Sequence, residues 1–183
     1  MNKIGDVFMQ DVFIEYIVKR KKDGKDFLIQ LFITISTFAV AGIILFLSPI
    51  LGAFSFFGVA ILAGITYLAL WLIRSRNIEF EYILTNGELD FDKIIAKSKR
   101  KRILTLKCKE FESFGRFNKD TVMLEEYKTK FYLCDSLDGE NIWYAGIKHP
   151  TNGKTIVVFN ANKKMLDGMR NFLPRNLVAN LTK

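Results

Sequence analysis

The feature that most constrains this chain is a run of 47 residues, from Phe27 to Ile73, without a single charged side chain. As a helix the run would extend about 70 Å, because each residue adds about 1.5 Å, and the hydrocarbon core of a bilayer is about 30 Å thick. It is too long for one membrane span and suits two. Ser48-Pro49, with Gly52 close behind, stands near the middle and is typical of a helix end and a turn. We therefore predict a transmembrane hairpin with helices over about 27–47 and 52–73.

A soluble helix pair or a signal peptide would account for this run less well. A pair of core helices in a soluble protein would carry polar residues at a helical period, whereas the few polar residues here are scattered. A cleaved signal peptide would have one shorter apolar stretch near its start, followed by a small-residue cleavage site. The length of the run and its lack of charge favour the membrane hairpin.

The charges that flank the run predict its orientation. Basic residues cluster before the first predicted span and after the second, and the turn between the spans has none. Because bases are enriched in the cytoplasmic loops of membrane proteins, we expect both termini in the cytoplasm and only the residues around Pro49 on the far side. The prediction is a cell-membrane protein with two spans. The flanking bases are Lys19, Arg20, Lys21, Lys22, Lys25, Arg74 and Arg76.

The N-terminal segment, residues 1–26, is predicted to contain a cytoplasmic amphipathic helix over Asp6–Lys22. Its apolar residues recur at intervals of about four, and Glu15 and Lys19 form a favourable pair on the other side. Two interpretations remain open. The helix lies on the inner leaflet with its basic end at lipid phosphates, or it packs against a soluble domain. The bases that would contact anionic lipid are Lys19, Arg20, Lys21 and Lys22.

From residue 77 to residue 183 the pattern becomes that of a strand-rich cytoplasmic domain. Apolar residues alternate with polar ones from Ile78 to Leu84, and Asn86-Gly87 follows, which is the strongest short signal for a two-residue hairpin turn. Such a turn places Leu84 opposite Leu89 and so continues one apolar face across both strands.

More strands and a closing helix are predicted downstream. Met165, Met169 and Leu173 recur at helical spacing, with Asn160 or Asn162 as the N-cap and Pro174 at the end. About seven antiparallel strands closed by one C-terminal helix make an α+β domain, a small barrel or sandwich. The further strands are expected over about 102–109, 113–117, 130–134, 141–147 and 155–160.

This plan is similar to that of pleckstrin-homology (PH) domains, which have seven strands and a C-terminal helix. The stretch Tyr82–Asp90, with the sequence YILTNGELD, resembles the opening hairpin of bacterial PH-like domains, which commonly follow a pair of membrane helices. The resemblance covers about residues 27–173. It implies a membrane-tethered domain of the binding or scaffold type and supplies no catalytic residue.

A basic segment between two predicted strands is the main candidate for contact with anionic lipid. Each base near an anionic leaflet contributes about 1 kcal/mol of attraction, although a solvated turn would have the same composition. Eukaryotic PH domains commonly bind phosphoinositides near the first strand loop, and here that loop, Asn86-Gly87, has no base. Specific inositol-phosphate recognition is therefore not expected. The basic segment contains Lys97, Lys99, Arg100, Lys101 and Arg102.

An acidic cluster is the main candidate for chemistry. Glu88, Asp90 and Asp92 share one strand face, with Glu81 opposite, and such carboxylates bind divalent cations or assist catalysis elsewhere. However, Lys107 and Lys109 on the next strand are sufficient to neutralise them. We therefore predict no catalytic, cofactor-binding or metal-binding residue.

The two cysteines, Cys108 and Cys134, fall among apolar neighbours in the predicted cytoplasmic part. We expect them to be buried free thiols, because disulfides are rare in the cytoplasm.

The sequence as a whole favours a membrane-anchored, non-catalytic binding or adaptor module with membrane lipids as partners. The alternative is an accessory subunit of a larger membrane complex, and an enzyme acting on lipid or nucleotide fits least well. Small residues such as Ala60 and Gly64 could also bring the hairpin against a protein partner or a second copy of itself. Nucleic acid is not expected as a partner, because the basic segment lacks interleaved aromatic residues.

Overall fold

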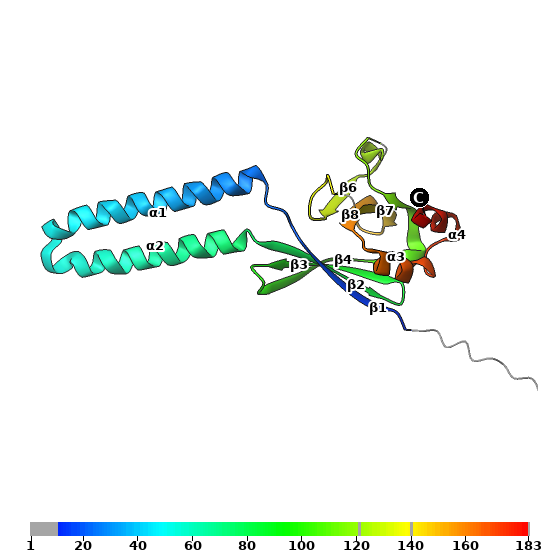
Figure 1. Ribbon diagram of the computed structural model, residues 1–183, viewed down its shortest axis with the longest axis horizontal. Coiled ribbons are helices and arrows are strands. Elements are labelled where there is room, and N and C mark those ends of the chain that lie inside the picture. The colour runs from blue at the N-terminus through cyan, green and yellow to red at the C-terminus, as the bar shows by residue number, and fades with distance from the viewer. Residues whose placement is uncertain (1–10, 121, 140, 183) are drawn as a thin grey trace, which may run out of the picture. The chain divides into compact units, whose positions relative to one another are not determined.

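The computed structural model describes residues 11–120, 122–139 and 141–182 (Figure 1). The chain divides into two compact units. The helical unit comprises Arg20–Ile78 together with Ile95–Lys99, and the other described residues form a β-rich unit.

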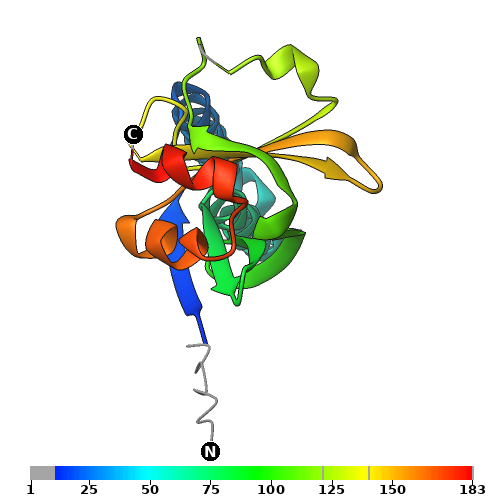
Figure 2. The same ribbon diagram turned by 90° about the vertical axis from the view of Figure 1, so that its right-hand side faces the viewer.

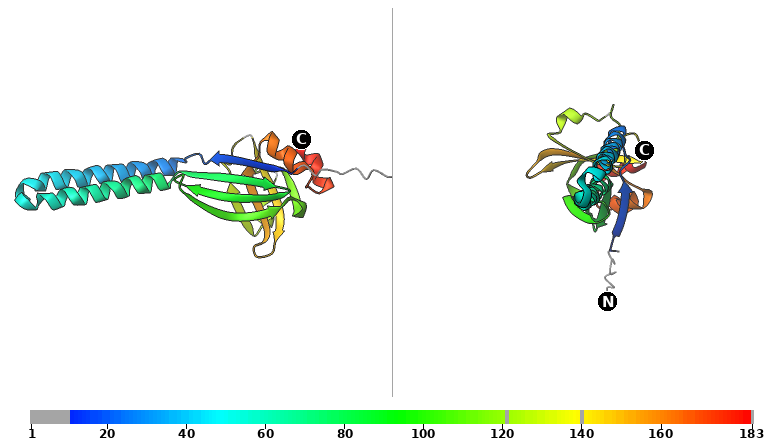
Figure 3. Two further views of the ribbon diagram at one scale, coloured as in Figure 1. Left: turned by 90° about the horizontal axis from the view of Figure 1, so that it is seen from below. Right: turned by 90° about the vertical axis from the view of Figure 1, so that its left-hand side faces the viewer.

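The helical unit is an antiparallel pair of long helices, seen side by side in the left panel of Figure 3. Helix α1 is Gly24–Leu51, a short 3-10 turn η1 is Gly52–Phe54, and helix α2 is Ser55–Ser75. Over Gly24–Ile50 and Gly52–Ser75 the mean hydropathy reaches 2.3 and 2.2, and none of the most apolar stretch of either helix is buried. By length and composition both helices can cross a membrane, so the two predicted apolar helices are present. The predicted end of the first helix at Ser48-Pro49 is wrong, because α1 continues through Pro49 to Leu51.

The predicted N-terminal helix is wrong where the structure describes it. Phe13–Lys19 form strand β1, which pairs antiparallel with β2 (Ile78–Thr85). Residues 6–10 of the predicted helix lie outside the described residues. Alternate side chains of β1 point into the core, Ile14 and Val18 among them, and the segment is rich in the β-branched and aromatic residues that favour strands. Pairing with β2 therefore prevails over the helical period.

The first sheet has the strand order β1-β2-β3-β4, with β3 at Glu88–Ile95 and β4 at Lys99–Lys107. Asn86 and Gly87 both have positive φ, 48° and 85°, as the predicted tight turn between β2 and β3 requires. A Cβ atom on Gly87 would also come within 2.6 Å of the Phe172 ring. The predicted hairpin is thus confirmed, and glycine is needed at its second position.

The second sheet has the order β5-β7-β8-β6. The predicted seven strands of residues 77–183 correspond to β2 to β8, and β1 adds an eighth from the N-terminal segment. The prediction that all of them are antiparallel is wrong, because β6 pairs with β8 in parallel. Strand β7 runs antiparallel to β8 and provides the return path that a parallel pair needs. The bounds are β5 Phe111–Arg116, β6 Thr129–Leu133, β7 Ile142–His149 and β8 Gly153–Asn160.

Two short helices follow the sheets: α3 at Lys163–Arg170 and α4 at Arg175–Val178, nearest the viewer in Figure 2. The Asn162 side chain accepts a hydrogen bond from the Met165 N–H at 2.9 Å, which confirms the predicted N-cap. Pro174 is the N-cap of α4, so it starts this helix rather than ending α3. The short 3-10 segments are η2 Cys108–Glu110, η3 Leu124–Glu126 and η4 Ala179–Thr182.

The core of the β-rich unit joins its two sheets. Tyr82 and Phe91 from the first sheet and Phe159 from the second are all buried and meet edge to face, with ring centroids 5.3–5.9 Å apart. The Tyr82 hydroxyl donates a hydrogen bond to the Leu133 carbonyl of the second sheet. The inward faces of both sheets therefore share one apolar interior.

Both cysteines are buried in the β-rich unit, as predicted, and neither forms a disulfide. Burial raises the pKa of the Cys108 thiol to about 12 and that of Cys134 to about 11. Both thiols are therefore protonated at neutral pH, which makes them poor nucleophiles.

Candidate functional site

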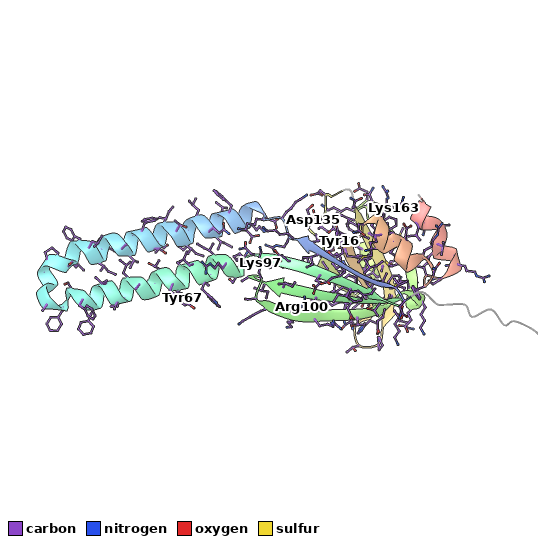
Figure 4. The ribbon with its side chains drawn as sticks, turned by 60° about the horizontal axis from the view of Figure 1, so that its bottom comes forward. Tyr16, Tyr67, Lys97, Arg100, Asp135 and Lys163 are labelled. Atoms are coloured by element: carbon purple, nitrogen blue, oxygen red, sulfur yellow. The ribbon has the colours of Figure 1, made fainter. Side chains whose placement is uncertain are left out.

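The turn between β3 and β4 carries part of the predicted basic segment and belongs to the helical unit. Ala96 and Lys97 both have positive φ, 53° and 56°, and the Ser98 N–H donates to the Ile95 carbonyl at 3.1 Å. The Ala96 N–H donates to the carbonyl of Asn77, just beyond the end of α2, at 2.9 Å. The turn is thereby fixed to the end of the hairpin, with Lys97 and Lys99 exposed (Figure 4 labels Lys97).

The same end of the helical unit contains a buried carboxylate. Asp26, in the first turn of α1, is 1 % exposed and forms ion pairs with Arg20 and Arg76. Arg20 precedes α1 and Arg76 follows α2, and the Arg76 Nε lies 3.0 Å from the carboxylate. Because Asp26 binds a guanidinium from each side, it ties the entrance of the hairpin to its exit. The sequence placed Asp26 at the edge of the apolar run but did not predict this contact.

Several further bases converge at this end of the hairpin. They come from the segment before and at the start of α1, from the last turn of α2 and from the β3–β4 turn, and all belong to one compact unit. Each of their side chains is exposed. We refer to these residues as the basic cluster: Lys21, Lys22, Lys25, Arg74, Lys97 and Lys99.

The predicted acidic cluster is present on the first sheet, with different partners from those expected. Glu81 accepts a hydrogen bond from Arg100 at 2.8 Å, and Arg102 contacts both Asp90 and Asp92 at 2.8 Å. The bases that neutralise these carboxylates are therefore at the start of β4. Lys107 and Lys109, which the sequence favoured for this role, form none of the ion pairs found in the described part of the chain.

Glu81 is the most unusual of these carboxylates. Its side chain is fully buried, and its Oε2 atom has no hydrogen-bond partner. Burial, reinforced by the neighbouring Glu15 carboxyl group, raises the pKa of Glu81 to about 7, although Arg100 opposes the shift. Near neutral pH the strength of the Glu81–Arg100 ion pair therefore depends on protonation.

These contacts divide the nine bases that the sequence assigned to lipid contact. Arg20, Arg100 and Arg102 are engaged by buried or half-buried carboxylates. Lys19 lies in β1 opposite Glu79, and Lys101 is exposed in β4. The other four, Lys21, Lys22, Lys97 and Lys99, belong to the basic cluster. Lys25 and Arg74, which the sequence marked only as topology signals, join them there.

The described residues offer no group of three or more His, Cys, Asp or Glu side chains arranged to hold a metal ion.

Two apolar helices of membrane-spanning length, together with two packed sheets and C-terminal helices, define a PH-like domain joined to a helical hairpin. A family model of a bacterial PH-like domain (DUF6106) matches residues 10–179. The chain therefore belongs to this bacterial PH-like family, as its opening strand hairpin predicted. No match was found among curated proteins or among solved structures.

Proposed function

We propose that this protein is a membrane-anchored, non-catalytic binding module whose basic cluster contacts anionic lipid headgroups at the cytoplasmic face. The hairpin supplies the anchor, and the basic cluster at the end of the hairpin supplies the surface that contacts lipid. Both termini lie in the cytoplasm in this arrangement, because the bases that flank the spans favour that side.

The observation that carries the proposal is the hydrogen bond from Ala96 to Asn77. It holds the β3–β4 turn at the end of α2, where the apolar surface stops and headgroups would begin. Lys97 and Lys99 then belong to the same compact unit as the bases of α1 and α2.

The expected attraction is moderate and depends on salt. Each base close to an anionic leaflet is worth about 1 kcal/mol, and the attraction falls off over about 10 Å at 0.1 M salt. The spans already hold the protein in the bilayer, so lipid contact would select and order the lipids around the hairpin rather than recruit the protein.

The test is to measure lipid selectivity with the full chain. The protein is reconstituted in phosphatidylcholine bilayers containing spin-labelled phosphatidylglycerol or spin-labelled phosphatidylcholine, and electron paramagnetic resonance gives the motionally restricted fraction of each. We expect phosphatidylglycerol to be preferred. The preference should weaken with added salt and in the double variant Lys97→Gln/Lys99→Gln.

A matched control separates local contact from overall charge. Lys128→Gln/Lys130→Gln removes the same charge from exposed lysines outside the basic cluster and should leave the preference intact. Equal preference for both lipids in the parent protein, or equal losses in the two double variants, would contradict the proposed contact.

The accessory-subunit alternative has one observation in its favour. A groove of about 350 Å³ lies between α1 and α2, and Phe38 and Leu70 contribute to its wall. The hydroxyls of Thr34 and Thr37 donate to carbonyls of their own helix, so the groove is apolar and could accept a helix of another subunit. A photo-crosslinker at position 38 in native membranes tests this idea. A stoichiometric protein adduct would favour the subunit, and adducts with lipid alone would count against it.

A further inference from the structure

A second charged surface lies in the β-rich unit and shares no residue with the basic cluster or with the carboxylates of the first sheet. It is a cleft of about 400 Å³ between β5, β7, α3 and the C-terminal segment. Arg116 at the end of β5, Trp143 in β7 and Leu181 in η4 form three of its sides. Asn180 donates a hydrogen bond to the Phe114 carbonyl at 2.8 Å, which fixes the C-terminal wall to β5. The cleft is therefore preformed.

Helix α3 turns one face toward this cleft. Lys163, Leu166, Asp167 and Arg170 all line it, and their spacing of three, four and seven residues places them on one side of a helix. Met165 and Met169 are buried on another side, and Lys164 is outside the lining. The bases at the two ends of the helix therefore share one opening (Figure 4 labels Lys163).

The charges of the cleft are not balanced within it. Three bases, Arg116, Lys163 and Arg170, face one acid, Asp167, which leaves a formal charge of +2. None of the three bases takes part in the ion pairs found among the described residues. The Arg116 guanidinium instead lies over the Trp143 ring, 5.8 Å from its centroid. Three bases that share one concave site with a single acid favour an anionic ligand.

We infer that this cleft binds a phosphate monoester group. A phosphate monoester carries a charge of about −1.5 to −2 at neutral pH, which matches the charge of the cleft, and guanidinium groups bind phosphate oxygens in a bidentate manner. Leu166 and Leu181 offer apolar surface to the remainder of the ligand. The site is independent of the basic cluster and of the proposed lipid contact.

The chain contains a spectroscopic reporter for this site. Its two tryptophans are Trp71 in α2 and Trp143 in the cleft wall, so Trp71→Phe leaves Trp143 as the only one. A phosphate that draws Arg116 away from the ring should change the fluorescence of Trp143. The test uses the full chain with Trp71→Phe in phosphatidylcholine nanodiscs and glycerol 3-phosphate as the probe. A second arm uses nanodiscs doped with phosphatidic acid, which carries the same group on a lipid.

We expect a saturable fluorescence change in one of the arms, and the arm that responds identifies a soluble or a lipid source. Lys163→Gln should weaken binding about tenfold, because a charge-assisted hydrogen bond is lost. Lys164→Gln removes the same charge from the neighbouring position and should change affinity less than about twofold. Asp167→Asn should tighten binding, a gain that misfolding cannot produce.

Three results would overturn the assignment. They are the absence of a saturable change in both arms, equal weakening by Lys163→Gln and Lys164→Gln, and no tightening by Asp167→Asn. Equal weakening would mean that the probe responds to the overall charge of the protein and not to this cleft, and no tightening would mean that Asp167 does not face the bound anion.

Discussion

The two units of this protein use the same apolar side chains in opposite ways. In the helical unit most of the large apolar side chains are exposed, and Phe38 is 74 % exposed. In the β-rich unit, by contrast, Phe159 is fully buried. The hairpin places its apolar surface outside, where lipid can cover it, and satisfies its backbone within each helix. The β-rich unit places its apolar surface inside, between two sheets. Apolar content alone therefore does not indicate a core.

The largest effect should come from removing a phenylalanine ring from the β-rich unit, whereas the same change in the helical unit should have almost no effect. Phe159→Ala leaves a cavity between the sheets and should lower the free energy of unfolding of the β-rich unit by about 3–5 kcal/mol. Phe38→Ala removes a ring that faces outward and should leave this value within about 0.5 kcal/mol. Denaturant unfolding of the full chain in mild detergent, followed by near-ultraviolet circular dichroism, measures both. Similar losses in the two variants would break the comparison.

A smaller effect concerns the buried carboxylate of the β-rich unit. The pKa of Glu81, about 7, lies above its ordinary value of 4.5, so the folded state holds the proton more tightly than the unfolded state does. The resulting stabilisation is complete below about pH 4.5 and is lost as the pH rises through about 7. Glu81→Gln cannot ionise and should not show this loss. Between pH 5 and pH 8 we expect the free energy of unfolding of Glu81→Gln to change by about 1–3 kcal/mol less than that of the parent protein.

Arg100 sharpens this prediction. Its guanidinium favours the ionised form of Glu81, so Arg100→Gln should raise the midpoint of the pH transition. Thermal unfolding at closely spaced pH values would show the shift. A midpoint that stays in place, or a Glu81→Gln variant with the pH dependence of the parent, would show that another group controls the transition.

The smallest effect should come from the turn that belongs to the helical unit. Ala96 has a φ of 53°, which costs an L-residue about 1–2 kcal/mol, and glycine removes most of that strain. Because glycine also loses about 0.5–1 kcal/mol of chain entropy on folding, Ala96→Gly should raise the free energy of unfolding by only about 0.5 kcal/mol. Ala145→Gly, in extended strand β7, lacks such relief and should destabilise instead. If Ala96→Gly does not raise the free energy of unfolding, the turn bears no strain.

Much of the fold could be predicted because its signals are local. The absence of charge between Asp26 and Arg74 indicates the hairpin, and Asn86-Gly87 indicates both a turn and its register. The N-cap at Asn162 depends on a contact only three residues away. Each of these features is decided by neighbours in the chain.

The predictions were wrong where contacts between residues far apart in the sequence determine the structure. The stretch Phe13–Lys19 fits both a helical period and strand alternation, and only pairing with β2 selects the strand. The parallel pairing of β6 with β8 likewise depends on the path of the chain through β7. No local pattern encodes either choice, although the Phe, Ile, Tyr and Val content of β1 was a signal that favoured a strand.

The same distinction applies to the sites. The sequence identified the bases near the membrane and the basic segment, but not the hydrogen bond that joins the β3–β4 turn to Asn77. The sequence predicted that the carboxylates on the first sheet are neutralised, but by Lys107 and Lys109. Arg100 and Arg102 do so instead, because the reach of a side chain across strands cannot be read from residue spacing alone. The cleft beside α3 was not predicted, since its walls come from four separate segments.

Strands β1 and β2 are neighbours in one sheet, yet the entire hairpin stands between them in the chain. The helical hairpin is thus an internal insertion and not a terminal tail. A fragment that begins after the second span lacks β1 and leaves β2 with a bare edge, so trimming the N-terminus cannot yield the intact domain. Lys19 and Glu79 are paired across the ladder, and a short linker from Lys19 to Ile78 in place of the helices would preserve every strand. During synthesis, the first sheet cannot be completed until both helices have left the ribosome.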